Sequence, residues 1–215
     1  FKGYSLLKDV IIAVVVIDDA TKAIDLAQAL LEGGVSAMEL TLLTPEALRA
    51  LEKVAANVPD MLVGAGTVLS PAQLVQARDA GAEFAVAPGF NPKVVSAAID
   101  MRFSFAPGVM TPSEIEGAVE MGCHLLKIFP ANVIGGPQAL KTMTAPYAHL
   151  GLRFLPLGGL TPENTAEYLR NPAVAACGGS WIAPAKLIVA GDWDAIRENA
   201  AKASELSRTA RAPNI

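Results

Sequence analysis

Residues 103–129 read FSFAPGVMTPSEIEGAVEMGCHLLKIF, and this stretch decides the fold class. The apolar runs 103–106 and 125–129 have the length and composition of buried strands. Between them Thr111, which precedes a proline, predicts the N-cap of a helix, and Gly122 predicts the end of that helix. Two strands that are joined by a helix pair in parallel, so the stretch predicts a βαβ unit.

The same unit recurs along the chain. Six further apolar runs of strand length are 10–17, 37–42, 61–63, 84–87, 153–157 and 174–177. Further capping residues that precede a proline are found at 44–45, 70–71, 91–92 and 161–162. Eight strand–helix units predict a single-domain (β/α)8 barrel, an α/β fold of the TIM type, over residues 1–215, with residues 1–9 as a leading helix. An open, doubly wound parallel sheet is the alternative architecture.

The composition limits the function classes. Of the 215 residues, 52% are hydrophobic and 18% are charged, which excludes a disordered chain. The net charge of -4 argues against binding to nucleic acid or to an anionic membrane surface. The longest apolar run, 10–17, is too short to span a bilayer. Two cysteines and two histidines give neither a disulfide framework nor a metal site, so we expect a cytoplasmic protein with reduced thiols.

Two ionisable residues lie in strands that should be apolar. With a period of two, Glu39 falls on the inward face of the run 37–42, and Lys127 falls on the inward face of the run 125–129. One interpretation is a structural ion pair between two strands. The other is a catalytic pair, because a lysine in a low-dielectric barrel can present a neutral amine, which attacks a ketone to give a Schiff base. Glu39 would then carry protons between the intermediates.

Glycines follow the last two predicted strands. Gly158 and Gly159 come after the seventh strand, and a Gly-Gly-Ser sequence at 178–180 comes after the eighth. Phosphate sites in such barrels are often built from these two loops, with backbone N–H groups directed at the anion. Tight turns that bind no ligand are the alternative interpretation.

Four motifs together resemble those of one known family. They are VGAGTV at 63–68, PGVMTP at 107–112, LKIFPA at 126–131 and GGSW at 178–181. They look like the motifs of the family of 2-keto-3-deoxy-6-phosphogluconate (KDPG) aldolase and 4-hydroxy-2-oxoglutarate (KHG) aldolase. The resemblance implies a class I aldolase, a lyase that cleaves KDPG to pyruvate and glyceraldehyde 3-phosphate without a metal or other cofactor. It also implies a homotrimer of (β/α)8 barrels.

The resemblance also implies roles for individual residues. Lys127 matches the lysine that forms the Schiff base, and Glu39 matches the general acid and base. The residues that match those around the pyruvate moiety are Thr67, Pro88 and Phe129. The residues that match the phosphate site are Gly158, Gly159, Gly179 and Ser180.

Three positions depart from the family's pattern. Leu43 stands where the family has a substrate-binding arginine, Leu157 where it has a threonine, and Ala13 where it often has a proline. The first two fall at the carboxyl ends of predicted strands, where a barrel has its active site. Leucine cannot replace the anion clamp of an arginine. We therefore expect Leu43 and Leu157 to contact the substrate and to alter its preference relative to KDPG, by engineering or by natural divergence.

Two other functions compete with this interpretation. A catalytically silent trimeric scaffold, reused for assembly, would carry its new apolar residues on outer helices rather than at the mouth of the barrel. A phosphate-binding barrel with other chemistry, such as an isomerase, would not need a lysine and a glutamate in two of its strands. Both arguments favour a pyruvate-dependent aldolase whose partners are small molecules, namely pyruvate and an aldehyde.

Overall fold

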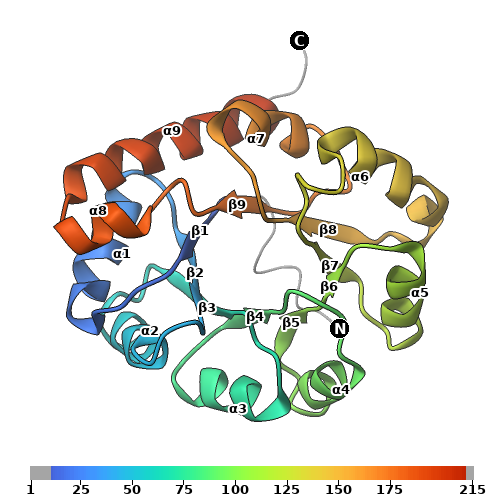
Figure 1. Cartoon of the computed structure of the whole chain (residues 1–215), viewed down its shortest axis with the longest axis horizontal. Helices are drawn as coiled ribbons and strands as arrows, with labels where there is room; N and C mark the ends of the chain where they lie inside the picture. The colour runs from blue at the N-terminus through green and yellow to red at the C-terminus, as the bar shows by residue number, and fades with distance from the viewer. Residues whose placement is uncertain (1–10, 212–215) are drawn as a thin grey trace.

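Apolar runs at regular spacing form a ring of parallel strands with helices around it (Figure 1). The computed structural model describes residues 11–211, so the leading helix expected over residues 1–9 lies outside the described residues. The strands are β1 (Ile11–Val15), β2 (Ala37–Thr41), β3 (Leu62–Gly66), β4 (Phe84–Val86), β5 (Ser104–Ala106), β6 (Gly108–Val109), β7 (Leu125–Ile128), β8 (Arg153–Pro156) and β9 (Cys177–Gly179). The α-helices are α1 (Ala23–Glu32), α2 (Ala47–Asn57), α3 (Pro71–Asp79), α4 (Pro92–Asp100), α5 (Pro112–Glu120), α6 (Gly136–Thr144), α7 (Pro162–Leu169), α8 (Ala185–Ala190) and α9 (Trp193–Arg211), and the 3-10 helices are η1 (Ala20–Lys22) and η2 (Ala145–Leu150).

The ring is built from two hydrogen-bonded sheets. One has the strand order β5-β4-β3-β2-β1-β9 and the other has the order β6-β7-β8, with parallel pairing throughout. Only Pro107 separates β5 from β6, and together they form one barrel strand that pairs with β4 and with β7. A parallel bridge between Phe154 and Val174 joins β8 to the segment that leads into β9. The eight strand positions confirm the predicted (β/α)8 barrel, and the open sheet is excluded.

The two faces of the strands pack into separate hydrophobic layers, as the period of two predicts. The residues that pack inside the ring include Ile12, Ala37, Phe84, Leu125 and Leu155. The residues that pack between the ring and the helices include Ala13, Met38, Leu40, Leu126 and Ile128. Glu39 and Lys127 alternate with the outer set, so their side chains enter the interior.

Most of the predicted helix signals are confirmed. The predicted N-caps that the structure bears out are Ser70, Asn91, Thr111 and Thr161. Glycines in the left-handed conformation follow α1, α3 and α5, at positions 34, 81 and 122. The predicted cap at Thr44 is wrong, since α2 begins only at Ala47 and Thr44 donates its hydroxyl to the carbonyl of Ile17. A carbonyl in the loop after β1 thus competes with the helix end for this hydroxyl.

The eighth strand also differs from the prediction. The sequence predicts a strand over 174–177 that ends before the two glycines. The observed strand is β9, which begins at Cys177 and includes Gly178 and Gly179. In the parallel pairing with β1, Gly178 lies opposite Ile12, and a Cβ atom there would overlap the backbone of Ile12. The glycines therefore permit a close approach of two strands, which an apolar run does not indicate.

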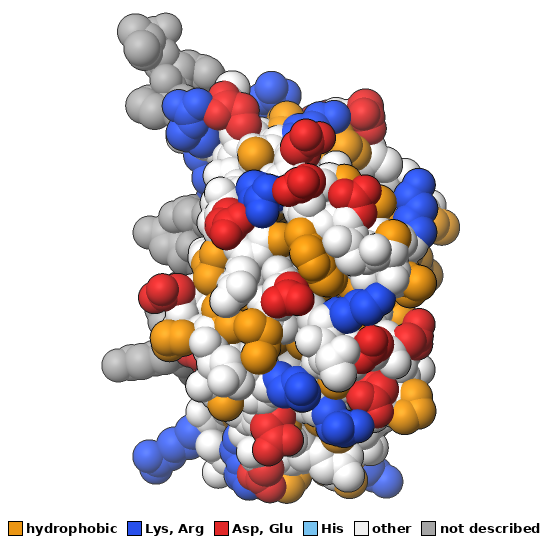
Figure 2. All heavy atoms as spheres, turned by 90° about the vertical axis from the view of Figure 1, so that its left-hand side faces the viewer, with side chains coloured by type: hydrophobic (Ala, Val, Ile, Leu, Met, Phe, Trp, Pro, Cys, Tyr) orange, Lys and Arg blue, Asp and Glu red, His pale blue; other side chains and the backbone are white. Residues whose placement is uncertain are grey.

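The outer surface is mixed in charge. The side that Figure 2 shows, with α1, α8 and α9, carries acidic and basic side chains interspersed rather than gathered by sign. Between α1 and α9, for example, Arg197 pairs with Glu32. Over residues 11–211, none of the helices has both the length and the apolar character that a membrane crossing requires.

Candidate active site

Lys127 and Glu39 meet inside the barrel. Glu39 is the middle residue of β2, and Lys127 is the third residue of β7, which lies across the ring from β2. Nζ of Lys127 lies 3.4 Å from Oε1 of Glu39. The two residues are 4% and 1% exposed, respectively. Because desolvating two charges is costly, an ion pair at this depth is weak evidence for a stabilising role and favours a functional one.

Phe129 flanks the lysine. Nζ of Lys127 lies 5.2 Å from the centroid of the Phe129 ring, within the range of a cation–π contact. The same ring packs against the turn after β8, since a Cβ atom on Gly158 would lie 2.9 Å from it. Phe129 thus connects the lysine to the glycine turn at the mouth.

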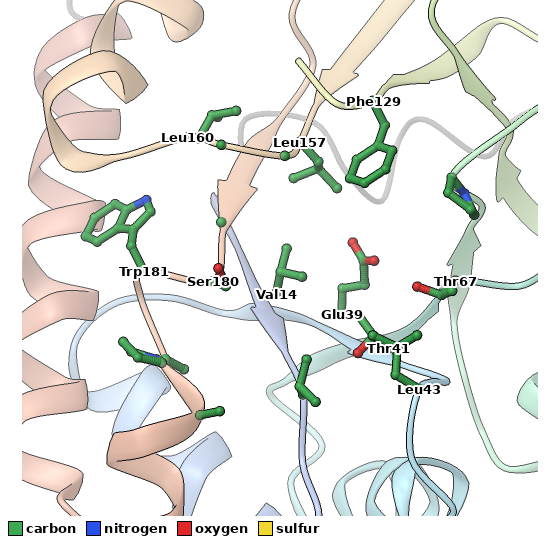
Figure 3. Close-up of a pocket in the computed structure, with 18 of the residues that line it drawn as sticks. Val14, Glu39, Thr41, Leu43, Thr67, Phe129, Leu157, Leu160, Ser180 and Trp181 are labelled. Carbon is green, nitrogen blue, oxygen red and sulfur yellow. The ribbon is translucent and has the colours of Figure 1, made fainter. Parts of the chain in front are cut away.

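Lys127 and Glu39 both line a cavity of about 640 Å³, a size that suits a small-molecule site. Figure 3 shows Glu39 pointing into this cavity. The cavity is lined by all the site residues selected from the sequence, which are Glu39, Leu43, Thr67, Pro88, Lys127, Phe129, Leu157, Gly158, Gly159, Gly179 and Ser180. Sequence reasoning missed the remaining lining residues, which are Val14, Val16, Thr41, Leu160, Trp181, Ala183, Pro184 and Ala185. Thr41 could have been found, because it shares the inward face with Glu39. The others are mostly apolar, and their pattern does not differ from that of core residues.

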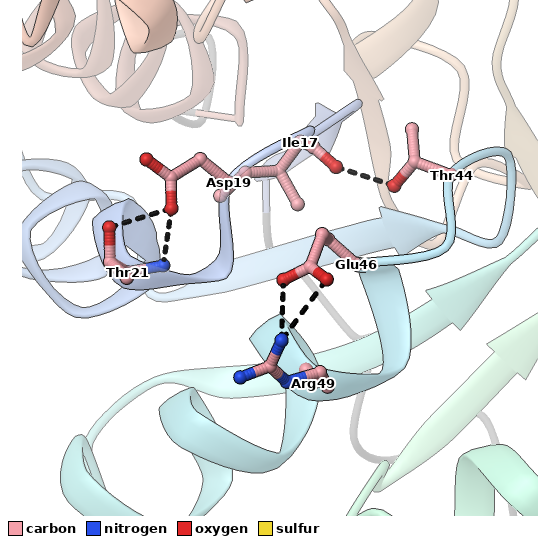
Figure 4. A network of polar contacts seen from close by, with 6 residues as sticks. All are labelled: Ile17, Asp19, Thr21, Thr44, Glu46 and Arg49. Atoms are coloured by element: carbon pink, nitrogen blue, oxygen red, sulfur yellow. Dashed lines mark hydrogen bonds and ion pairs between the residues drawn. The ribbon is translucent and has the colours of Figure 1, made fainter.

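The loop that carries Leu43 is fixed by hydrogen bonds on both sides of that residue. Thr41 donates its hydroxyl to the carbonyl of Val15 over 2.9 Å, and Thr44 donates to the carbonyl of Ile17 (Figure 4). Leu43 itself is 61% exposed at the rim of the cavity. A large apolar side chain is therefore presented to the mouth from a rigid base.

Leu157 lies on the inner wall of the same cavity. It is 2% exposed and packs with the residues inside the ring, and Figure 3 places it between Phe129 and Val14. Its N–H donates to the carbonyl of Ile128, so the backbone position is set by β7. Ala13, the third departure from the family pattern, packs between the ring and the helices instead.

Backbone geometry at the mouth requires special residues. Gly158 and Gly159 have φ values of 90° and 78°, which suit glycine, and a Cβ atom on Gly159 would lie 2.8 Å from Cβ of Asn132. Thr67, which follows β3 directly, has a φ of 58° although it is β-branched. Such strained residues cluster at functional sites, because the surrounding structure must hold them.

Charges are scarce in the cavity. Among the lining residues that the structure describes, Lys127 is the one cation and Glu39 the one carboxylate. Residues 11–211 contain no group of three or more His, Cys, Asp or Glu side chains that could hold a metal ion. His124 is exposed and precedes β7, on the side of the barrel away from the mouth. The arrangement therefore offers an amine next to a carboxylate, which suits nucleophilic attack on a carbonyl with proton transfer.

The two cysteines do not take part in the site. Cys123 and Cys177 are free and buried. Burial raises the pKa of Cys123 to about 11 and that of Cys177 to about 12. Both are therefore neutral thiols near pH 7, which are poor nucleophiles.

Comparisons with known proteins agree on one family. The sequence profile of KDPG and KHG aldolase matches residues 4–199. The chain is 42% identical over 186 residues to the 2-dehydro-3-deoxy-phosphogluconate aldolase of Treponema pallidum, covering 86% of this chain and 88% of that protein. It is 39% identical over 195 residues to the KHG/KDPG aldolase of Escherichia coli K12, covering 91% of each. The crystal structure of Legionella pneumophila KDPG aldolase, in which pyruvate is captured as a covalent carbinolamine, superposes with a TM-score of 0.90 at 36% identity, covering 95% of this chain and 98% of that one.

Proposed function

The chain belongs to the KDPG and KHG aldolase family, and from this premise we propose that Lys127 forms the Schiff base and that Glu39 moves the protons. The enzyme is a class I aldolase, a lyase that makes or cleaves a carbon–carbon bond between pyruvate and an aldehyde. One observation carries the residue assignment. The Lys127 amine and the Glu39 carboxylate lie 3.4 Å apart at the base of the cavity.

The proposed reaction follows from this pair. Lys127 first gives a proton to the Glu39 carboxylate beside it, and its free amine then attacks the ketone carbon of the substrate. The carbonyl oxygen takes up that proton to give a carbinolamine. Loss of that hydroxyl as water gives a protonated imine, which accepts the electron pair of the bond that breaks. In cleavage, a proton leaves the substrate hydroxyl, the aldehyde departs and an enamine of pyruvate stays on Lys127. Glu39 accepts and returns these protons, one of which adds to the methylene carbon of the enamine and restores the imine. Hydrolysis of that imine releases pyruvate and the free amine.

The remaining site residues are assigned by their place around the pair. We assign Thr67, Pro88 and Phe129 to the pyruvate moiety. The turn with Gly158 and Gly159, together with Gly179 and Ser180, is assigned to a distal phosphate. The support is that these residues line the same cavity and that the turn is free of side chains, which lets backbone N–H groups approach an anion.

The substrate preference is proposed to differ from that of KDPG. Leu43 and Leu157 place apolar side chains at the rim and on the inner wall of a cavity whose one cation among the described residues is Lys127 itself. A carboxylate or phosphate on the substrate then lacks an arginine partner and binds less tightly. The affinity for an uncharged aldehyde does not depend on such an arginine. A more apolar aldehyde partner is therefore favoured.

A homotrimer and a cytoplasmic location are also part of the proposal. An apolar groove of about 680 Å³ between α5 and α6 is lined by Met110, Ile134 and Met143, and Met110 is 46% exposed. A second copy of this chain is the proposed occupant. Met110→Asp should lower the molar mass below three times 22.3 kDa in light scattering, whereas Val189→Asp, on α8, should not.

The free thiols of Cys123 and Cys177 suit a reducing compartment, which supports the proposed cytoplasmic location.

Trapping with borohydride tests the central assignment. Incubation with pyruvate and borohydride should add one reduced pyruvyl group to Lys127, located by peptide mapping. Glu39→Gln should still be trapped, because it retains the amine. An adduct on Lys93, Lys141 or Lys186 would overturn the assignment. The absence of any adduct on a folded protein would favour a silent scaffold.

A further inference from the structure

Few hydrogen bonds hold the carboxylate of Glu39. Its Oε1 atom contacts Nζ of Lys127, and its Oε2 atom is buried without a hydrogen-bond partner among the described residues. A buried carboxylate is ordinarily oriented by several donors. Packing against neighbouring atoms must therefore set the position of this carboxylate.

The neighbouring atoms belong to the inward face of β3. In the pairing of β2 with β3, Glu39 lies opposite Gly64, and Thr41 lies opposite Gly66. The Glu39 side chain leans along the strand toward the mouth, and its end lies directly over Gly66. A Cβ atom on Gly66 would overlap Oε1 and would lie 2.6 Å from both Cγ and Cδ of Glu39.

The backbone conformation at position 66 does not require a glycine. The backbone of Gly66 is not in the left-handed region, so alanine could adopt it without strain. At Gly64, two residues earlier, the ring of Phe84 instead occupies the space of a side chain, and a Cβ atom there would overlap that ring. The two inward glycines of β3 thus make room for different groups, an aromatic ring below and the carboxylate above.

We propose that Gly66 is a positioning residue for the aldolase reaction, whose missing side chain lets the Glu39 carboxylate reach Lys127. This inference rests on the proposed roles of Lys127 and Glu39. A methyl group at position 66 would push the carboxylate away from β3, because contacts under 3.0 Å are not tolerated. The amine would stay in place, since Lys127 comes from the opposite strand β7. The variant would then form the imine but transfer protons poorly.

The test separates imine formation from proton transfer. In wild type with pyruvate in D2O, borohydride trapping reports the imine, and exchange of the pyruvate methyl hydrogens, followed by NMR, reports enamine formation. Gly66→Ala should retain trapping at Lys127. Its exchange rate should fall by at least about tenfold, because a displaced general base loses part of the 10² to 10⁴-fold that such groups contribute. The pH dependence of the residual exchange rate in Gly66→Ala should also differ from that of wild type.

Two further variants make the result specific. Gly89→Ala is the matched control, since a Cβ atom there meets nothing within 4 Å and the backbone is not left-handed; its exchange rate should equal that of wild type. In a Glu39→Ala background, Gly66→Ala should cause no more than about a twofold additional loss, because it acts through Glu39 alone. The double variant should also melt at a higher temperature than Gly66→Ala.

The possible outcomes are distinct. Wild-type exchange in Gly66→Ala would overturn the inference, as would a full additive loss in the double variant. If Gly66→Ala does not fold, folding of Glu39→Ala/Gly66→Ala supports the inference, and its failure to fold overturns it. If wild type shows neither trapping nor exchange, the proposed function itself fails.

Discussion

Restoring polar groups at the mouth should shift the enzyme toward KDPG. The change is Leu43→Arg together with Leu157→Thr. A charged hydrogen-bonded arginine contributes about 1.5–3 kcal/mol, which is roughly 10- to 150-fold in affinity at 1.4 kcal/mol per tenfold. Leu43 is 61% exposed, so solvent screens the new pair and the lower end of that range applies. We expect kcat/KM for KDPG cleavage to rise by at least about tenfold.

The structure also sets the cost of the double change. The loop at position 43 is fixed through Thr41 and Thr44, and its exposed side chain packs little, so Leu43→Arg should leave the fold intact. Leu157 is buried, and its replacement by threonine should destabilise the protein by about 1–3 kcal/mol, measured as a lower Tm. The cavity next to position 157 gives the hydroxyl access to substrate and water.

The assay measures kcat/KM for both substrate classes in the parent and in the double variant. Pyruvate released from KDPG is followed by its reduction with NADH and lactate dehydrogenase, and condensation of pyruvate with an apolar aldehyde is followed by product formation. The double change should lower kcat/KM for the condensation of pyruvate with the apolar aldehyde. Ile99→Arg, which adds the same charge at the C-terminal end of α4, should change neither value. A parent that already cleaves KDPG as well as the double variant would refute the altered preference.

The other predictions concern proton transfer, metal dependence and the thiols. Glu39→Gln keeps the size of the side chain but cannot shuttle protons, so kcat should fall by about 10² to 10⁴-fold with an unchanged circular dichroism spectrum; an unchanged kcat would assign the protons to another group. Activity should survive EDTA, and a loss restored by a divalent ion would contradict the Schiff-base mechanism. Since burial holds the pKa of Cys123 at about 11 and that of Cys177 at about 12, both stay protonated at pH 8 and should react with a disulfide reagent only after unfolding. Rapid reaction of the folded protein would contradict this burial.

The sequence alone was sufficient to predict the barrel fold and to select the charged residues Glu39 and Lys127. Glu39 and Lys127 were found because a charge in an apolar strand stands out and because the period of two gives its direction. The contact between them needed the closure of the ring, which brings β2 opposite β7. No local sequence pattern predicts the distance between the Lys127 amine and the Glu39 carboxylate.

Other features could not be derived because they depend on atoms far apart in the chain. Thr44 has the local signature of an N-cap, yet the carbonyl of Ile17 from the preceding loop takes its hydroxyl. Gly178 resembles a turn glycine, yet its role is the close pairing with β1. Trp181 and Leu160 line the cavity, but as apolar residues they gave no signal that distinguished them from the core.

The filled lower half of the barrel imposes an order on binding and release. Beneath Lys127 and Glu39 the interior is occupied by buried side chains that include Phe84, Leu125 and Leu155. Over the residues that the structure describes, the open route to this pair is the mouth. Pyruvate held as the proposed Schiff base on Lys127 would therefore lie deepest, with the aldehyde between it and solvent. In cleavage the aldehyde must depart before pyruvate does, and in synthesis pyruvate must enter first. Steady-state kinetics should therefore be ordered, with pyruvate a competitive inhibitor against the cleaved substrate and the aldehyde product a noncompetitive one.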